Sequence, residues 1–229
     1  MSLLQRELAV FDLETTGVDV RTARIVTACL ARLDSEGALL ERRDWLADPG
    51  IEIPAGAAAV HGISTERARA EGRPAAEVVA EVLEAVRAEL AAGIPVVVYN
   101  APYDLSLLAA EALRYGLVPL NNPRPIIDPL VIDKAVDRYR KGKRTLEAAC
   151  AHYGVALDGA HDAGVDAIAA GHVARAIAVA HAAALPATLD ELQSAQAAWH
   201  EQQASSFEDY MRTQRDHTFT ADRGWPVRL

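Results

Sequence analysis

The chain has 229 residues, of which 51% are apolar and 24% are charged, and its formal net charge is −9. This length suits one domain with a sizeable core, and the composition excludes a chain that is disordered throughout. The acidic balance argues against a broad cationic surface wrapped by nucleic acid but allows an enzyme whose carboxylates hold metal ions. Because no apolar run approaches the roughly 20 residues that span a bilayer, we expect a cytoplasmic protein without membrane contact.

The first half of the chain predicts the larger part of a mixed β-sheet. Residues 7–17, 24–34 and 39–48 are rich in branched and apolar side chains and are joined by short connections that contain glycine, a pattern typical of an antiparallel meander. A helix that opens at Pro74 precedes the apolar run 95–99, which is expected to be a buried strand. Because a strand, a crossover helix and a second strand form a right-handed parallel unit, this fourth strand can lie beside the first.

The second half predicts helices around one more strand. Residues 103–115, 145–153 and 162–185 show helical patterns, and residues 125–128 are expected to form a short fifth strand. The expected architecture is therefore an α/β domain over residues 1–185, with a mixed five-stranded sheet and flanking helices.

A helical extension is expected after this domain. Pro186 interrupts the preceding helix, and Thr188 with Glu191 forms a capping box for a polar helix that reaches about Gln214. We therefore expect residues 186–229 to be a separate C-terminal segment.

Two carboxylates interrupt the apolar first strand. Asp12 and Glu14 are two residues apart, so in a strand both side chains point to the same face. Two like charges side by side are costly to bury unless a cation or other donors compensate, which favours a site for hard metal ions. The solvent-facing side of an edge strand is the alternative interpretation of the same pattern.

Two further acidic motifs open helices. Asp104 stands four residues after Asn100 in the first turn of one helix, and His161 precedes Asp166 by five residues at the entrance of the long helix. These acids also have structural interpretations. Asp104 at a helix N-terminus can complement the helix dipole, Asp162 can cap its helix, and Asp166 can face solvent. The His161-Asp162 dipeptide also occurs in metal phosphohydrolases, but the supporting histidine and aspartate motifs of those enzymes are absent from this sequence.

Taken together and in this order, the three motifs resemble the DEDDh family of 3′ to 5′ exonucleases, the group that includes the proofreading epsilon subunit of bacterial DNA polymerase III. The resemblance extends from residue 7 to about residue 185 and includes Ile-Pro and Val-His-Gly-Ile-Ser within residues 53–64 and Lys-Gly-Lys-Arg-Thr-Leu at residues 141–146. It departs at Tyr99, where the family often has an aliphatic residue or histidine. The resemblance implies a ribonuclease H-like fold for the five-stranded sheet.

This resemblance also implies a mechanism with two metal ions and a histidine base. The carboxylates of Asp12, Glu14, Asp104 and Asp166 would hold two Mg²⁺ ions, for which Mn²⁺ would substitute. His161 would take the proton of the attacking water, a task that suits histidine because this side chain titrates near neutral pH. The expected activity is removal of nucleoside 5′-monophosphates from the 3′ end of DNA, in proofreading or repair.

Other residues are expected to hold the substrate strand. The resemblance implies contacts with the terminal nucleotides from side chains of the first strand, the His-Gly-Ile segment and the second motif, namely Leu13, Thr15, Thr16, Val60, His61, Asn100 and Tyr103. For Leu13 and Tyr103, ordinary core packing is the alternative to substrate contact. For His61, the alternative is a loop position without contact to substrate. The basic run 138–144 is the densest of the chain. It favours contact with backbone phosphates, which we assign to Lys143, and a solvated loop is the alternative interpretation.

The sequence leaves the partner and the biological role open. The expected partner is a single-stranded or frayed 3′ end of DNA, and RNA or a short oligoribonucleotide is the alternative because four carboxylates do not distinguish the sugars. A non-catalytic nucleic-acid-binding or protein-binding module of the same fold is the alternative of another class. The extension could dock on the catalytic domain, self-associate or bind a polymerase, and residues 214–219 are faintly similar to a sliding-clamp motif.

Overall fold

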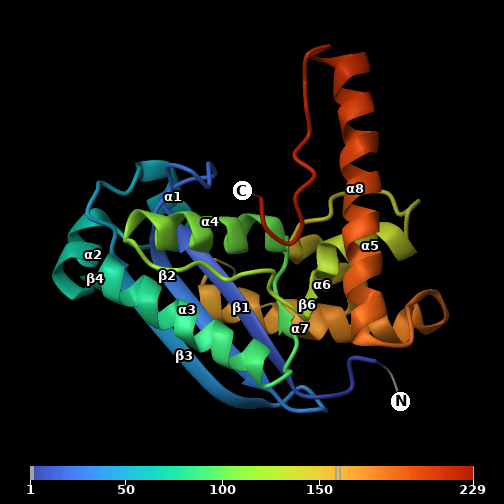
Figure 1. Cartoon of the computed structure of the whole chain (residues 1–229), viewed down its shortest axis with the longest axis horizontal. Coiled ribbons are helices and arrows are strands. Elements are labelled where there is room, and N and C mark those ends of the chain that lie inside the picture. Colours follow the sequence, from blue (N-terminus) through green and yellow to red (C-terminus); the bar gives the residue numbers. More distant parts are fainter. Residues whose placement is uncertain (1–2, 158, 160, 229) are drawn as a thin grey trace.

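The computed structural model describes residues 3–157, 159 and 161–228, with a six-stranded sheet at its centre (Figure 1). The strands β1 (Leu8–Thr15), β2 (Ile25–Leu33) and β3 (Leu39–Asp48) form the predicted antiparallel meander. β5 (Val96–Val97) pairs in parallel with β1, and β6 (Ile126–Ile127) pairs in parallel with β5. The sheet is therefore mixed, and the predicted position of the fourth strand beside the first is confirmed.

The sixth strand, β4 (Arg73–Pro74), pairs in parallel with β3 and completes the order β4-β3-β2-β1-β5-β6. The sequence predicted only five strands, because Pro74 was interpreted as the first residue of a helix and not as part of a strand. In the structure β4 ends at Pro74 and α3 (Ala75–Ala91) begins at the next residue. Proline is tolerated there because β4 is an edge strand, where a missing N–H breaks no ladder hydrogen bond.

Helices cover both faces of the sheet (Figure 1). α3 and α4 (Ala101–Arg114) pack on the face to which Phe11 and Leu13 of β1 point. α6 (Leu146–Tyr153) and α7 (Ala163–Ala180) pack on the opposite face, against Leu8 and Val10. The alternation of β1 side chains between two apolar layers therefore fixes which face its polar residues share.

The long helix of the sequence analysis corresponds to α7, which ends at Ala180 and is followed by the 3₁₀ turn η1 (Ala182–Ala184). A side chain at Gly171 would approach Val10 to 2.6 Å, so this glycine lets α7 lie directly on β1. Among the described helices, only α7 is long and apolar enough to cross a membrane, and 56% of it is buried inside the protein. This burial is that of a core helix.

Three short helices were not predicted: α1 (Ala55–His61), α2 (Thr65–Glu71) and α5 (Pro129–Val136). Each has eight residues or fewer, too few for a clear helical period in the sequence. Their ends follow local rules, because Ser64 and Asp128 accept backbone N–H groups at the starts of α2 and α5, and Gly62 ends α1 with a left-handed φ of 75°.

The C-terminal helix α8 (Leu189–Gln214) begins with the predicted capping box of Thr188 and Glu191. The chain then returns toward α4, where the backbone N–H of Arg228 donates to Ser106 Oγ at 2.7 Å. α8 also contacts α5 and the edge strand β6. We therefore propose that residues 186–229 are an extension docked on the sheet edge; residues 1 and 229, the outer ends of the two predicted segments, lie outside the described residues.

Candidate active site

The end of β1 carries two carboxylates on the face covered by α7. Leu8 and Val10 belong to the apolar layer beneath α7, and Asp12 and Glu14 continue the same row because side chains alternate along a strand. Phe11 and Leu13 point to the opposite layer and are buried. The two acids thus lie where the apolar layer beneath α7 ends.

Asp104 approaches β1 from the first turn of α4. Its side chain is 3% exposed, and its Oδ1 accepts the backbone N–H of Leu13 at 3.1 Å. Asn100, the residue before α4, has a left-handed backbone with φ 67° and ψ 49°. The carboxylate of Asp128 accepts the backbone N–H groups of Asn100 and Ala101, each at 3.0 Å, and so fixes the direction in which α4 starts.

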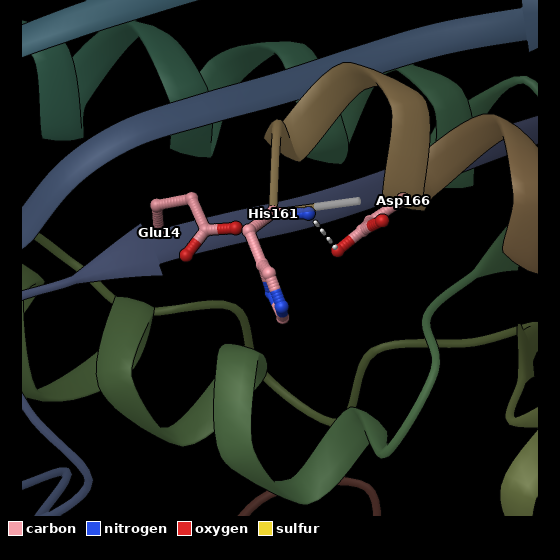
Figure 2. Close-up of side chains that lie close together, drawn as sticks. All are labelled: Glu14, His161 and Asp166. Atoms are coloured by element: carbon pink, nitrogen blue, oxygen red, sulfur yellow. Dashed lines mark hydrogen bonds between the residues drawn. The ribbon is translucent and has the colours of Figure 1, made fainter. Parts of the chain in front are cut away.

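The start of α7 brings a histidine and the fourth acid to the same place. One ligand atom each of Glu14, His161 and Asp166 lies within 4.8 Å of the others (Figure 2). Asp166 Oδ2 accepts the backbone N–H of His161 at 3.2 Å, while its buried Oδ1 has no hydrogen-bond partner among the described residues. His161 is exposed and has a left-handed φ of 71°, which turns the chain into the helix.

Burial and mutual repulsion raise the pKa values of the four carboxyls. The pKa of Asp12 is raised well above its ordinary value by burial and by the charges of Asp104, Glu14 and Asp166. The pKa of Glu14 rises to about 7 for the same kinds of reason, with Asp166 as its main charged neighbour. Burial also raises the pKa values of Asp104 and Asp166. These acids are ionised together only at an electrostatic cost, which divalent cations bound among their oxygens would offset.

Arg42 of β3 supports the loop that carries His161. Its guanidinium pairs with Asp44 at 2.7 Å and with Asp162 at 3.2 Å. A side chain at Gly164 would overlap this guanidinium at 2.2 Å, so the absence of one lets Arg42 lie against the first turn of α7. Asp162 also accepts the backbone N–H groups of Gly164 and Val165, as its capping interpretation predicts.

A cavity of about 350 Å³ opens beside this loop. Its lining includes His161 and Asp162, Arg42 and Trp45 of β3, and His61. The cavity therefore brings the predicted His-Gly-Ile segment next to the predicted catalytic histidine, although the two lie far apart in the sequence.

Tyr103 and His61 are half-buried predicted substrate residues. Tyr103 OH donates to the backbone oxygen of Gly17 at 2.5 Å and lies 2.5 Å from Thr15 Oγ1, so its phenol is fixed at the end of β1. His61 accepts the N–H of Ile63 at Nδ1, and its buried Nε2 has no partner among the described residues.

Leu13 and Thr16 have structural contacts. Leu13 belongs to the core cluster with α3 and α4, and Thr16 Oγ1 accepts the backbone N–H of Arg24 at 2.9 Å. Val60 and Lys143 are exposed, whereas Asn100 is half-buried. Their roles toward substrate stay predictions.

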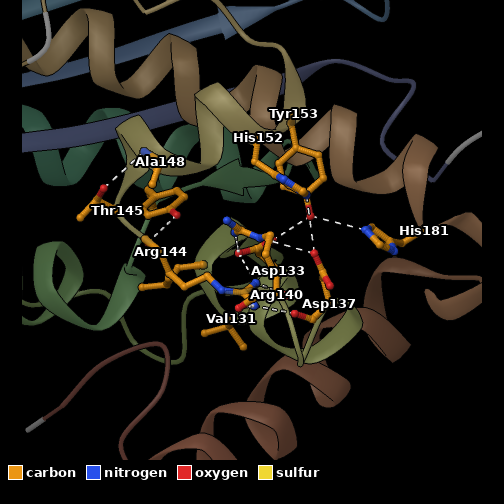
Figure 3. A network of polar contacts seen from close by, with 12 residues as sticks. Val131, Asp133, Asp137, Arg140, Arg144, Thr145, Ala148, His152, Tyr153 and His181 are labelled. Carbon is orange, nitrogen blue, oxygen red and sulfur yellow. Dashed lines mark hydrogen bonds and ion pairs between the residues drawn. The ribbon is translucent and has the colours of Figure 1, made fainter. Parts of the chain in front are cut away.

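The basic loop of the sequence analysis contains a buried ion-pair network (Figure 3). Arg140 and Arg144 both donate to the carboxylate of Asp133, which is fully buried, and Tyr153 OH donates to it at 2.7 Å. These two arginines are therefore fixed by the fold, and the exposed cations of the run are Arg138, Lys141 and Lys143.

Sequence reasoning missed Asp128 and Arg42, which position the site, and Asp133, which holds the arginines of the basic loop. Asp128 has a recognisable signal, because an acid followed by proline at the end of a strand is typical of a helix N-cap. Arg42 and Asp133 have none, because their partners lie far away in the sequence and become neighbours only in the folded chain.

Comparison with known proteins gives one family match. Residues 9–174 match the RNase_T family profile, which is described as exonuclease. A DNA polymerase III PolC-type protein of Halalkalibacterium halodurans is 28% identical over 171 residues, which cover 75% of this chain and 11% of that protein. A DNA polymerase III subunit epsilon-like protein of Rhodobacter capsulatus is 32% identical over 150 residues, which cover 65% of this chain and 20% of that protein.

Solved structures of exonuclease I share the fold. One of them aligns with a TM-score of 0.65 and 18% identity over 93% of this chain and 45% of that chain. Escherichia coli exonuclease I in complex with a dA16 oligonucleotide aligns with a TM-score of 0.63 and 21% identity over 76% of this chain and 40% of that chain. This chain thus spans less than half the length of these relatives and structures.

Proposed function

The chain belongs to the RNase_T family of exonucleases, and from that premise we propose that it removes nucleoside 5′-monophosphates from the 3′ end of DNA. The observation that carries the proposal is the group of Glu14, His161 and Asp166 beside the electrostatically coupled Asp12 and Asp104. Five chemically suited side chains, from β1, the first turn of α4 and the start of α7, support the proposal. A member of the fold that only binds nucleic acid would have no need of all five.

The four carboxylates fit divalent cations. They offer hard oxygen ligands, the Oδ1 of Asp166 has no hydrogen-bond partner among the described residues, and the raised pKa values support a site for positive charge. We assign Asp12, Glu14, Asp104 and Asp166 as ligands of two Mg²⁺ ions, with Mn²⁺ as a substitute. When bound, such ions acidify water and stabilise the charge that develops on the phosphoryl oxygens.

We assign His161 as the general base. Its ring nitrogen lies within 4.8 Å of carboxylate oxygens of Glu14 and Asp166, so it can take a proton from a water molecule held beside them. Arg42 and Asp162 hold the loop of this histidine in position. The bond that breaks joins the phosphorus to the 3′ oxygen of the preceding nucleotide, and the product keeps a 5′-phosphate.

The terminal nucleotide would lie against the end of β1. Tyr103 is fixed there by Thr15 and Gly17 and offers a ring face for base stacking. His61, Val60 and Asn100 are assigned to the rim of the same site. Leu13 and Thr16 would contribute mainly through their backbone, because their side chains are buried.

DNA is the proposed substrate because of the relatives. The names of the two sequence relatives are those of DNA polymerase III components, and solved exonuclease I structures contain DNA oligonucleotides. We propose a single-stranded or frayed 3′ end as the partner and proofreading or repair as the role, with polymerase or clamp contact assigned to residues 186–229.

The test is hydrolysis of matched single-stranded DNA and RNA oligomers that carry a label at the 5′ end. With Mg²⁺ present, we expect a ladder that shortens from the 3′ end of the DNA, with nucleoside 5′-monophosphate as the product and slower cleavage of the RNA. Faster cleavage of RNA would overturn the assignment to DNA. No monophosphate from either strand would overturn the assignment as an active exonuclease.

A further inference from the structure

Two adjoining cavities between α5 and α8 form a groove outside the carboxylate site. Their volumes are about 490 and 280 Å³, and both are lined by Lys134, Gln203 and Phe207. Figure 1 shows α5 and α8 crossing at the side of the molecule opposite α1 and α2. We refer to these two cavities as the α5–α8 groove.

The lining of this groove is basic in a protein that is acidic overall. Lys134, Arg138, Arg140, Arg144 and Arg228 line it, and Asp222 is the one acidic residue among the lining side chains of the described chain. Over the whole sequence acids outnumber Lys and Arg by 32 to 23, so this concentration of positive charge departs from the balance elsewhere. A groove of this charge favours a polyanion.

Part of the charge in the groove is not neutralised by a carboxylate of the described residues. Arg140 and Arg144 are neutralised by Asp133, but neither Lys134 nor Arg138 forms an ion pair with a described residue. The Nε of Arg228 is buried without a hydrogen-bond partner in the described residues. Burial also lowers the pKa of Lys134, a penalty that a bound anion would relieve.

The groove also offers aromatic surface. Phe207 is 51% exposed at the part shared by both cavities and meets Phe219 edge-on at 5.4 Å, so its ring is supported rather than free. Trp199 lines the larger cavity. Cations that track a backbone, together with supported aromatic faces, are the two features that hold single strands without reading their sequence.

The groove is linked to the carboxylate site through α4. Asn100, the residue before α4, lines the smaller cavity, and Asp104 in the first turn of α4 accepts the N–H of Leu13 in the carboxylate site. The smaller cavity therefore lies at the N-terminus of the helix that carries Asp104.

We propose that the α5–α8 groove binds single-stranded DNA on the 5′ side of the nucleotide being removed, with Lys134 and Arg138 on phosphates and Phe207 under a base. This proposal deepens the exonuclease assignment and rests on it for the direction of the strand. It gives the C-terminal extension a role in substrate binding, since α8 supplies one wall of the groove.

The charge is tested with the double variant Lys134→Gln/Arg138→Gln, compared with Arg43→Gln/Arg69→Gln, which removes the same charge from exposed positions outside the groove. For an oligothymidylate of about 20 nucleotides, we expect the groove variant to raise KM about tenfold and to reduce the salt dependence of binding by a slope of about 1.4, the value for two phosphate contacts. Hydrolysis of a dinucleotide, which is too short to reach the groove, should stay within about twofold of wild type.

Stacking is tested separately with Phe207→Ala. We expect this variant to weaken oligothymidylate binding about tenfold, within the range measured for single stacked bases, while the salt slope stays unchanged. Phe207→Tyr should bind like the wild type. Tyr210→Ala removes an equally exposed aromatic side chain of α8 that does not line the groove, and it should have no effect.

Binding measured by fluorescence anisotropy in EDTA separates this proposal from the exonuclease assignment. If the wild type binds the oligomer through the groove but hydrolyses no strand when Mg²⁺ is added, the catalytic assignment fails and the groove stands. Unchanged KM and salt slope in Lys134→Gln/Arg138→Gln would overturn the groove while hydrolysis persists. Displacement of the oligomer by polyglutamate at equal charge concentration would overturn single-stranded DNA as the occupant, in favour of an acidic protein.

Discussion

At the scale of single residues, Asp12 carries the greatest electrostatic burden of the site. Burial and the charges of four other carboxyls act on it, and every one of these causes raises its pKa. We therefore propose that an ionised Asp12 serves to bind a cation and does not contribute to stability. The cost appears only when cations are withheld.

Replacement of Asp12 by asparagine should separate function from stability. We expect Asp12→Asn to reduce Mg²⁺-dependent hydrolysis on the order of a thousandfold. In EDTA its Tm should rise by about 2–4 °C, the shift that 1 kcal/mol produces in a chain of this size. Asp209→Asn, at an exposed position on α8, is the control and should change neither quantity. Normal turnover in Asp12→Asn would remove this residue from the catalytic site.

His161 makes a different prediction because its proposed role is proton transfer. His161→Ala should lose most of the activity but recover part of it as the pH rises, because hydroxide needs no base. The measurement is kcat against pH for the variant and the wild type at saturating Mg²⁺, with thermal unfolding as the check on folding. A variant profile parallel to that of the wild type would show that His161 does not act as the base.

Residue positions along β1 could be predicted from the sequence, but the neighbours of those residues could not. The two-residue spacing of Asp12 and Glu14 fixes a shared face in any strand, and the structure has them there. The same alternation predicts that Leu13 is buried, which is the core-packing alternative. Arg42 and Asp162 are 120 positions apart, and no sequence pattern predicts that they pair.

At the scale of elements, α8 acts as a substitute for a neighbouring strand. Gln193 Oε1 accepts the backbone N–H of Ile126 at 2.8 Å, and Gln196 Oε1 accepts that of Asp128 at 2.7 Å. Gln196 Nε2 donates to the backbone oxygen of Ile126 at 2.9 Å. Two side-chain amides thus satisfy the open edge of β6, which otherwise would present unpaired backbone groups.

Gln196→Ala should therefore destabilise the protein strongly. It leaves a buried N–H and a buried C=O unpaired, and each such group costs about 1–3 kcal/mol. We expect urea unfolding to show a loss of about 3 kcal/mol, whereas Gln202→Ala on the exposed face of the same helix should stay within about 0.5 kcal/mol. Equal stability of the two variants would show that α8 is not needed to close the sheet.

The sequence predicted that α8 is a helix but not what it does. Its capping box and length were readable, yet Gln193 and Gln196 belong to a polar pattern that normally indicates solvent. For the basic run at residues 138–144, the sequence predicted exposed charge where the structure has buried ion pairs. The sequence pattern indicates that Arg140 and Arg144 are surface cations, whereas in the folded chain both donate to the carboxylate of Asp133.

At the scale of the whole molecule, charge is divided between two sites of opposite sign. The acidic cluster at the end of β1 suits cations, and the α5–α8 groove suits phosphates, although the net charge is −9. Stability should therefore depend on pH and metal together. In the metal-free protein the pKa of Glu14 is about 7, above its ordinary 4.5, so its contribution to stability is complete below pH 4.5 and is lost as the pH rises through about 7.

Thermal unfolding at a series of pH values tests this coupling. In EDTA we expect the Tm to fall as the pH rises from about 5 to about 8, and Mn²⁺ to restore it most at the upper end, where the carboxyls must be ionised. Glu14→Gln should show a smaller fall. A Tm increase from Mn²⁺ that is the same at every pH would contradict the pKa values assigned to this cluster.

The most direct measurement of the central claim is calorimetric titration of the protein with Mn²⁺ near neutral pH. If the four carboxyls form one cation site, the wild type should bind two ions and release protons into the buffer, Asp12→Asn should bind at least one ion fewer, and Asp209→Asn should match the wild type. An Asp12→Asn titration that superimposes on that of the wild type, or a wild type that binds no Mn²⁺, would contradict it.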